Sequence, residues 1–220
     1  AAVEKGGDIN ALIQGASIAT PADGASIAIL DLARILYQEN SDASARIFAQ
    51  MALDLSPKRE DAHILIAASF SRDNQTDQAI AEYNKIPEAS PSYLMTQHEA
   101  AELLSGSGRM DDAVALLNKL YNTHHDPDSL IRVGDLYRSK QNFKKALEVY
   151  DIVATKLPNP LPKQYWYLLY ARGMTEERLN NWPKAEADLQ QALAFQPDHP
   201  YIMNYLGYAW IDQGVHMDEA

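Results

Sequence analysis

The chain has 220 residues, 46% hydrophobic and 22% charged, a balance typical of one or two globular domains rather than of a disordered or membrane protein. Its formal net charge of −11 argues against a nucleic-acid partner, since such a partner needs many Lys and Arg side chains; a basic, neutral or peptide-like partner fits better. The absence of cysteine excludes disulfides, a thiolate nucleophile and a cysteine metal site, and is compatible with either a reducing or an oxidising compartment.

Residues 1–20 are predicted to be an irregular lead-in. They lack the basic start and the apolar stretch of a signal peptide. A weakly apolar segment, Ile9 to Ile13, is interpreted as the remnant of an upstream helix. The sequence Thr20-Pro21-Ala22-Asp23 then predicts a helix start, because it offers a capping hydroxyl, a proline at the first helical position and a carboxylate in the first turn.

From residue 21 onward, small residues recur at nearly constant spacing. The residue that opens each predicted second helix is Ala45, Ala79, Ala113, Ala146, Ala185 or Ala220, at separations of 34, 34, 33, 39 and 35 residues. Another small residue stands twelve positions earlier, or thirteen in the last unit: Ala33, Ala67, Ala101, Gly134, Gly173 and Gly207. Closing prolines are Pro57, Pro91, Pro158 and Pro197. The longer interval of 39 indicates an insertion at 159–163.

The stretch from Asp128 to Pro158 carries the whole pattern in one piece. Gly134 and Ala146 are small enough for two antiparallel helices to approach closely, and Tyr150 covers the crossing with apolar surface. The pattern resembles that of tetratricopeptide repeat (TPR) proteins. The resemblance implies an all-α fold, a right-handed α-solenoid of antiparallel helix pairs (the TPR superhelix), in which each unit contacts only its neighbours.

The predicted organisation is therefore a lead-in over 1–20 and a repeat array over 21–220. The array has five helix pairs and the first helix of a sixth, at about 21–57, 58–91, 92–126, 127–158, 161–197 and 199–220. Since the chain stops where a second helix should begin, we expect a fragment of a longer array. Met203, Leu206 and Trp210 are then expected to form an uncovered apolar face that favours self-association through the C-terminal end.

The cellular compartment is predicted from a sequence resemblance alone. The N-Y-L-G-Y segment, Asn204 to Tyr208, is similar to that of bacterial TPR proteins exported to the envelope. It implies a periplasmic or envelope-associated protein, with the cytoplasm as the alternative. No apolar run approaches the length of a membrane-spanning helix, so no membrane insertion is expected.

No catalytic, metal or cofactor site is predicted. His124-His125-Asp126 could suggest a metal site, but adjacent histidines cannot share one helical face and a third strong ligand is missing from the local pattern. Glu176-Glu177 is interpreted as exposed helix charge. Arg172 stands at a position that is normally apolar, four residues before Glu176, and is expected to form an internal ion pair with Glu186 or Asp188 rather than a ligand contact.

In TPR proteins the first helix of each repeat lines the concave wall, so the resemblance implies a partner-binding groove there. Its residues in this sequence are Arg34, Tyr37, Asp135, Arg138, Tyr167, Tyr170, Met174, Arg178, Tyr201, Asn204 and Tyr208. Tyrosine offers wide contact area and the Asn204 amide can bond a peptide backbone. The alternative is that the tyrosines only complete the packing between repeats. Arg34 and Leu30 stand where the chaperone-tail clamp of the family has Asn and Lys, which argues against a chaperone adaptor.

The predicted function is a non-enzymatic protein–protein interaction scaffold that binds a peptide or a partner helix in the concave groove. Two alternatives stay open: an assembly protein whose repeats pack on other copies, and the docking module of a larger enzyme.

Overall fold

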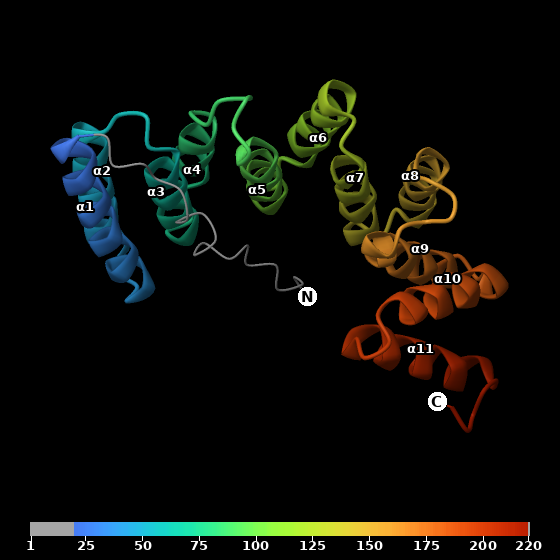
Figure 1. The fold of residues 1–220 in the computed structure, drawn as a ribbon. Coiled ribbons are helices and arrows are strands. Elements are labelled where there is room, and N and C mark those ends of the chain that lie inside the picture. Colours follow the sequence, from blue (N-terminus) through green and yellow to red (C-terminus); the bar gives the residue numbers. More distant parts are fainter. Residues whose placement is uncertain (1–19, 220) are drawn as a thin grey trace. The chain divides into compact units, whose positions relative to one another are not determined.

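The computed structural model describes residues 20–219, and all regular secondary structure in that range is helical (Figure 1). The chain divides into two compact units, Ala1–Arg109 and Met110–Ala220. The predicted helix remnant at Ile9–Ile13 lies outside the described residues.

The first unit contains five described helices. They are α1 (Pro21–Gln38), α2 (Asp42–Leu55), α3 (Glu60–Arg72), α4 (Thr76–Tyr83) and α5 (Tyr93–Gly106). Consecutive helices pack on each other from α1 to α5. The predicted start of α1 is confirmed: the Thr20 hydroxyl accepts the Asp23 amide at 3.1 Å, and the Asp23 carboxylate accepts the Thr20 amide at 3.0 Å.

The second unit contains six described α-helices and one short 3-10 helix. They are α6 (Met110–His124), α7 (Pro127–Ser139), α8 (Phe143–Lys156), η2 (Lys163–Tyr165), α9 (Trp166–Arg178), α10 (Trp182–Phe195) and α11 (Pro200–Gln213). The closest packing is between α7 and α8 and between α9 and α10. The predicted all-α fold of paired antiparallel helices is confirmed in both units.

A left-handed residue stands in the short connection between the first and second helix of each predicted repeat. These residues lie two positions before the second helix and have φ of 60°, 58°, 84°, 59° and 61°: Asn40, Asn74, Gly108, Gln141 and Asn180. The following amide donates to the carbonyl five residues back, as in Asn142 to Tyr137 at 2.9 Å. This bond is the signature of a Schellman helix end, which reverses the chain within a few residues.

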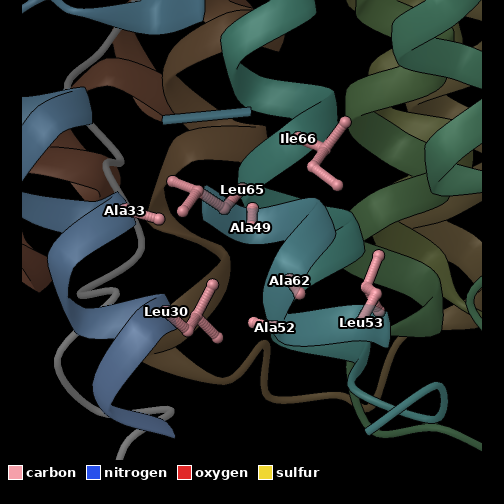
Figure 2. Close-up of a cluster of buried hydrophobic side chains, with 8 residues drawn as sticks. All are labelled: Leu30, Ala33, Ala49, Ala52, Leu53, Ala62, Leu65 and Ile66. Atoms are coloured by element: carbon pink, nitrogen blue, oxygen red, sulfur yellow. The ribbon is translucent and has the colours of Figure 1, made fainter. Parts of the chain in front are cut away.

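The core of the first unit is built from small and branched apolar residues (Figure 2). It contains Leu30, Ala33, Ala49, Ala52, Leu53, Ala62, Leu65 and Ile66, from α1, α2 and α3. The repeating alanines Ala33, Ala45, Ala67 and Ala79 are fully buried. Their small size lets the helix backbones approach, as the repeat pattern predicts.

In the second unit, Gly134 and Gly173 let α7 and α9 approach their partners. A Cβ at Gly134 would collide with the Tyr150 ring, and one at Gly173 would lie 2.9 Å from Leu189 Cγ and 3.0 Å from the Ala185 carbonyl oxygen. Tyr150 and Leu189 are fully buried. Both glycines are therefore required by close helix contact.

Met203, Leu206 and Trp210 were expected to be uncovered, and this expectation is wrong for two of the three residues. Leu206 is fully buried, and α11 packs on α10. Trp210 is half-buried and its indole Nε1 donates to Glu186 at 2.7 Å. Of the three, Met203 alone is exposed, at 51%, because α10 already covers the opposite side of α11.

Candidate partner-binding face

Nine of the predicted groove residues lie in the second unit, on α7, α9 and α11. The structure separates them into side chains held by internal contacts and side chains that face solvent.

Asp135 and Arg138 belong to the internal group. The Tyr150 hydroxyl donates to Asp135 at 2.6 Å, and Arg138 reaches both Asp135, at 3.2 Å, and the Tyr150 hydroxyl, at 3.3 Å. Burial, followed by the charge of Asp135, raises the pKa of Tyr150. This network joins α7 to α8 and fixes the Tyr150 ring in the core.

Tyr167 is tied to the preceding first helix. Its hydroxyl donates to the Asp128 carboxylate, which joins α9 to α7. The pKa of Tyr167 is raised, chiefly by burial and then by the hydrogen bond to Asp128. The side chain therefore contributes to packing between repeats, which is the alternative that the sequence left open.

Tyr170 makes its contacts toward α11. Its hydroxyl lies 3.4 Å from the Tyr201 carbonyl oxygen, and its ring meets the Tyr205 ring edge-on at 6.0 Å. The Tyr205 hydroxyl in turn donates to Glu177 at 3.0 Å. Tyr205 was absent from the sequence prediction, although its place on α11 four residues after Tyr201 could have indicated contact with α9. Met174 is half-buried beside these residues on α9.

Four predicted residues face solvent. Tyr201 is 57% and Tyr208 is 66% exposed, and Asn204 is exposed between them on α11. Arg178 is exposed at the end of α9, with its Nε 3.5 Å from Glu177. Ile211, 48% exposed, continues the same face of α11. The sequence prediction did not include Ile211, although its position three residues after Tyr208 places it there.

Arg34 and Tyr37 lie in the first unit and have internal partners. Arg34 forms ion pairs with Asp31 at 2.6 Å and with Asp61 at 2.8 Å. The Arg72 guanidinium covers the Tyr37 ring at 3.6 Å and donates to the Tyr37 carbonyl at 2.7 Å. The structure therefore gives both residues a role in joining α1 to α3.

Arg172 forms the internal clamp that the sequence predicts. Its Nε and Nη2 donate to the two oxygens of Asp188, at 2.6 and 2.8 Å, which joins α9 to α10. Glu186, the other expected partner, instead accepts the Trp210 indole. Glu176, interpreted from the sequence as exposed, is only 3% exposed because it lies in the same helix pair, and one of its carboxylate oxygens has no hydrogen-bond partner.

The His124-His125-Asp126 segment, weighed as a metal site from the sequence, lies where α6 ends and α7 begins. Within residues 20–219, no group of three or more His, Cys, Asp or Glu side chains is arranged to hold a metal ion. His125 adopts φ of 52° and places its ring edge-on to Tyr121. None of the described helices is long and apolar enough to span a membrane.

Comparisons with known proteins agree with the helix-pair fold. Residues 170–218 match the family model for the tetratricopeptide repeat. The TPR repeat-containing protein PA4667 of Pseudomonas aeruginosa is 26% identical over 163 residues, which is 72% of this chain and 26% of that protein. The RNA polymerase-associated protein CTR9 of Saccharomyces cerevisiae is 25% identical over 121 residues, 53% of this chain and 11% of that protein. The chain thus spans about a quarter or less of these relatives.

Several solved structures share the fold. A TPR protein from Parabacteroides merdae superposes with a TM-score of 0.61 at 14% identity, over 89% of this chain and 76% of that chain. The thermophilic TPR protein TTC0263 of Thermus thermophilus superposes with a TM-score of 0.55 at 15% sequence identity, over 84% of this chain and 99% of that chain. YrrB, described as a TPR protein with an unusual peptide-binding site, superposes with a TM-score of 0.51 at 17% sequence identity, over 82% of this chain and 91% of that chain. Residues 170–218 therefore resemble a tetratricopeptide repeat in sequence, and the helix pairs of the chain share the fold of solved TPR proteins.

Proposed function

We propose that this chain is a non-enzymatic scaffold that binds a segment of a partner protein on the exposed face of α11, beside the end of α9. The observation that carries the proposal is the exposure of Tyr201, Asn204 and Tyr208 on one side of a helix whose other side is buried. Exposed tyrosines gathered on one helix face favour a contact surface, because their rings gain free energy when they leave water.

The side chains on this face suit a protein ligand. Tyr201 and Tyr208 provide large rings with few rotatable bonds, so little entropy is lost when a partner orders them. The Asn204 amide between them can donate to a backbone carbonyl and accept from a backbone amide. Arg178 lies at the edge of this face, where its guanidinium is 3.5 Å from the Glu177 carboxylate.

Site-specific photo-crosslinking in the native host tests this proposal. A photoreactive phenylalanine analogue at position 208 should crosslink a discrete partner protein, whereas the same analogue at Gln191, which is exposed on α10, should not. The double variant Asn204→Ala with Tyr208→Ala should lose that partner in co-purification while its melting temperature stays unchanged. Equal crosslinking from both positions, or from neither, would contradict the proposal.

Self-association through α11 is the second candidate, and the 51% exposure of Met203 favours it. Sedimentation velocity over a range of concentrations tests it: a dimer that Met203→Glu dissolves would support self-association, and a monomer throughout would exclude it.

The envelope location is likewise a proposal, supported by the N-Y-L-G-Y resemblance alone. Fractionation of the native host into periplasm, membranes and cytoplasm tests it.

A further inference from the structure

The C-terminal part of the second unit is rich in acidic residues. From Ala185 to Ala220 the sequence has six carboxylate side chains and no lysine or arginine. The acidic residues are Glu186, Asp188, Asp198, Asp212, Asp218 and Glu219. Arg172 on α9 neutralises Asp188, but Asp212 is exposed on α11 itself. The α11 helix itself therefore carries one carboxylate, Asp212, and no lysine or arginine.

The exposed side of α11 has the spacing of a helix–helix seam. Tyr201, Asn204, Tyr208 and Ile211 are separated by three, four and three residues, which aligns them along one face. The same spacing lets two helices pack along a shared apolar stripe. Asn204 is the one polar side chain among these four, and a single polar residue in such a seam can fix the register of the second helix.

Carboxylates border this seam on the side of α9. Asp212 follows Tyr208 by four residues, so it lies one turn further along the helix. Glu177 of α9 is held beside α11 by the Tyr205 hydroxyl at 3.0 Å. Arg178 lies next to Glu177, at 3.5 Å, and compensates part of its charge. Side chains that flank a docked helix would thus lie next to the exposed Asp212, where Lys and Arg are the complementary types, with the partly covered Glu177 as a weaker second carboxylate.

We propose that the partner segment is a cationic amphipathic helix that packs lengthwise on α11. Its apolar side chains cover Tyr201, Tyr208 and Ile211, one polar side chain meets Asn204, and its Lys or Arg flank faces Asp212 and Glu177. This inference rests on the proposed function, because it names the class of partner for the same face. A second copy of α11 is a poorer occupant, since it would bring Asp212 and the acidic C-terminal residues next to like charges.

The test measures fluorescence anisotropy of three labelled synthetic peptides, each about three heptads long, with the whole chain. The first has leucine at the seam positions, one central asparagine and lysine on both flanks. The second replaces every lysine by glutamate. The third keeps the lysines but has two interior prolines, which prevent a helix. We expect the first peptide to bind and the other two to bind about tenfold or more weakly.

Variants of the protein locate the binding. Tyr208→Ala combined with Ile211→Ala should weaken the lysine peptide about tenfold or more, because central anchors carry most of an interface's free energy. Ile152→Ala on α8 is the matched control, since Ile152 is also apolar and 50% exposed, and it should change nothing. Asp212→Lys should weaken the lysine peptide and strengthen the glutamate peptide.

Four results would overturn the inference. They are equal binding of the proline peptide, equal binding of the glutamate peptide, insensitivity to the Tyr208 and Ile211 variants, and no binding of any peptide. A dimer that the Tyr208→Ala change dissolves would also overturn it, in favour of a second copy. If no peptide binds but the photoreactive group at position 208 still crosslinks a host protein, this inference fails and the proposed function stands; loss of both removes both.

Discussion

Gly134 and Tyr150 meet at the crossing of α7 and α8 so closely that a Cβ on Gly134 would collide with the Tyr150 ring. The ring cannot move aside easily, because it is fully buried and its hydroxyl donates to Asp135 at 2.6 Å. A single methyl group at position 134 therefore forces either the ring or the helix to shift.

Gly134→Ala should lower the free energy of unfolding by about 1 to 3 kcal/mol, the usual range for overpacking. The loss should appear although alanine favours a helix over glycine by about 1 kcal/mol. Gly106→Ala at the end of α5 is the control, because its added Cβ would have no neighbour within 4 Å. Urea denaturation checks both; equal stability of Gly134→Ala and the original chain would contradict the close contact.

Removing one partner of the Arg172–Asp188 pair should be costly. The two side chains are only 20% and 10% exposed, so Arg172→Met or Asp188→Leu alone leaves a largely buried charge and should cost about 3 to 5 kcal/mol. The double variant should recover a large part of that loss. A double-mutant cycle from denaturation curves measures the coupling, and simple additivity of the two losses would show that the pair acts as two independent charges.

Glu176 should make stability depend on pH. Burial, and then the charge of Asp188, raises its pKa above the ordinary 4.5, while Arg172 and Lys184 oppose the shift. The unfolded chain loses this proton at lower pH than the folded chain, so the group's contribution to stability falls as pH rises from about 4.5 through the folded-state pKa. Glu176→Gln should remove that slope and raise the melting temperature at neutral pH. An unchanged pH profile would contradict the assignment.

Substitutions of the tyrosines in the predicted groove should differ in how much they lower the free energy of unfolding. Tyr167→Phe removes the hydroxyl that binds Asp128 and should cost about 1 kcal/mol. Tyr208→Phe and Tyr208→Ala alter a side chain that is 66% exposed and should stay within about 0.5 kcal/mol of the original. Chemical denaturation measures both. A large loss for Tyr208→Ala would assign that residue to packing instead of to partner contact.

Gln141 should be a site where substitution stabilises the chain. It adopts φ of 59° between α7 and α8, a left-handed conformation that costs a residue with a Cβ about 1 to 2 kcal/mol. Gln141→Gly should therefore raise the melting temperature, with part of the gain offset by the greater freedom of glycine in the unfolded chain. Gly108→Ala, at the equivalent position with φ of 84°, should lower it. Changes of the same sign would contradict this explanation.

The helix pairs could be predicted because their signals are local and repeated. The small residues Gly134, Ala146 and Ala185, the prolines and the capping sequence at Thr20 each follow from the contact of a helix with its own neighbour in the chain. The Arg172–Asp188 ion pair could be predicted for the same reason, since the spacing of Arg172 and Asp188 in the helix pair brings them together. The left-handed Gln141 could not, because glutamine gives no such signal and the turn imposes the conformation.

The sequence by itself determined that this protein is a series of antiparallel helix pairs with α11 rich in aromatic residues. Only the tertiary structure decided which of the tyrosines a partner can reach. Asp128 holds Tyr167 and Glu177 holds Tyr205, whereas Tyr208 is exposed. The physical reason is that helical spacing sets the face on which a side chain lies, while its exposure depends on whether a neighbouring helix places a hydrogen-bond acceptor or an apolar surface against it.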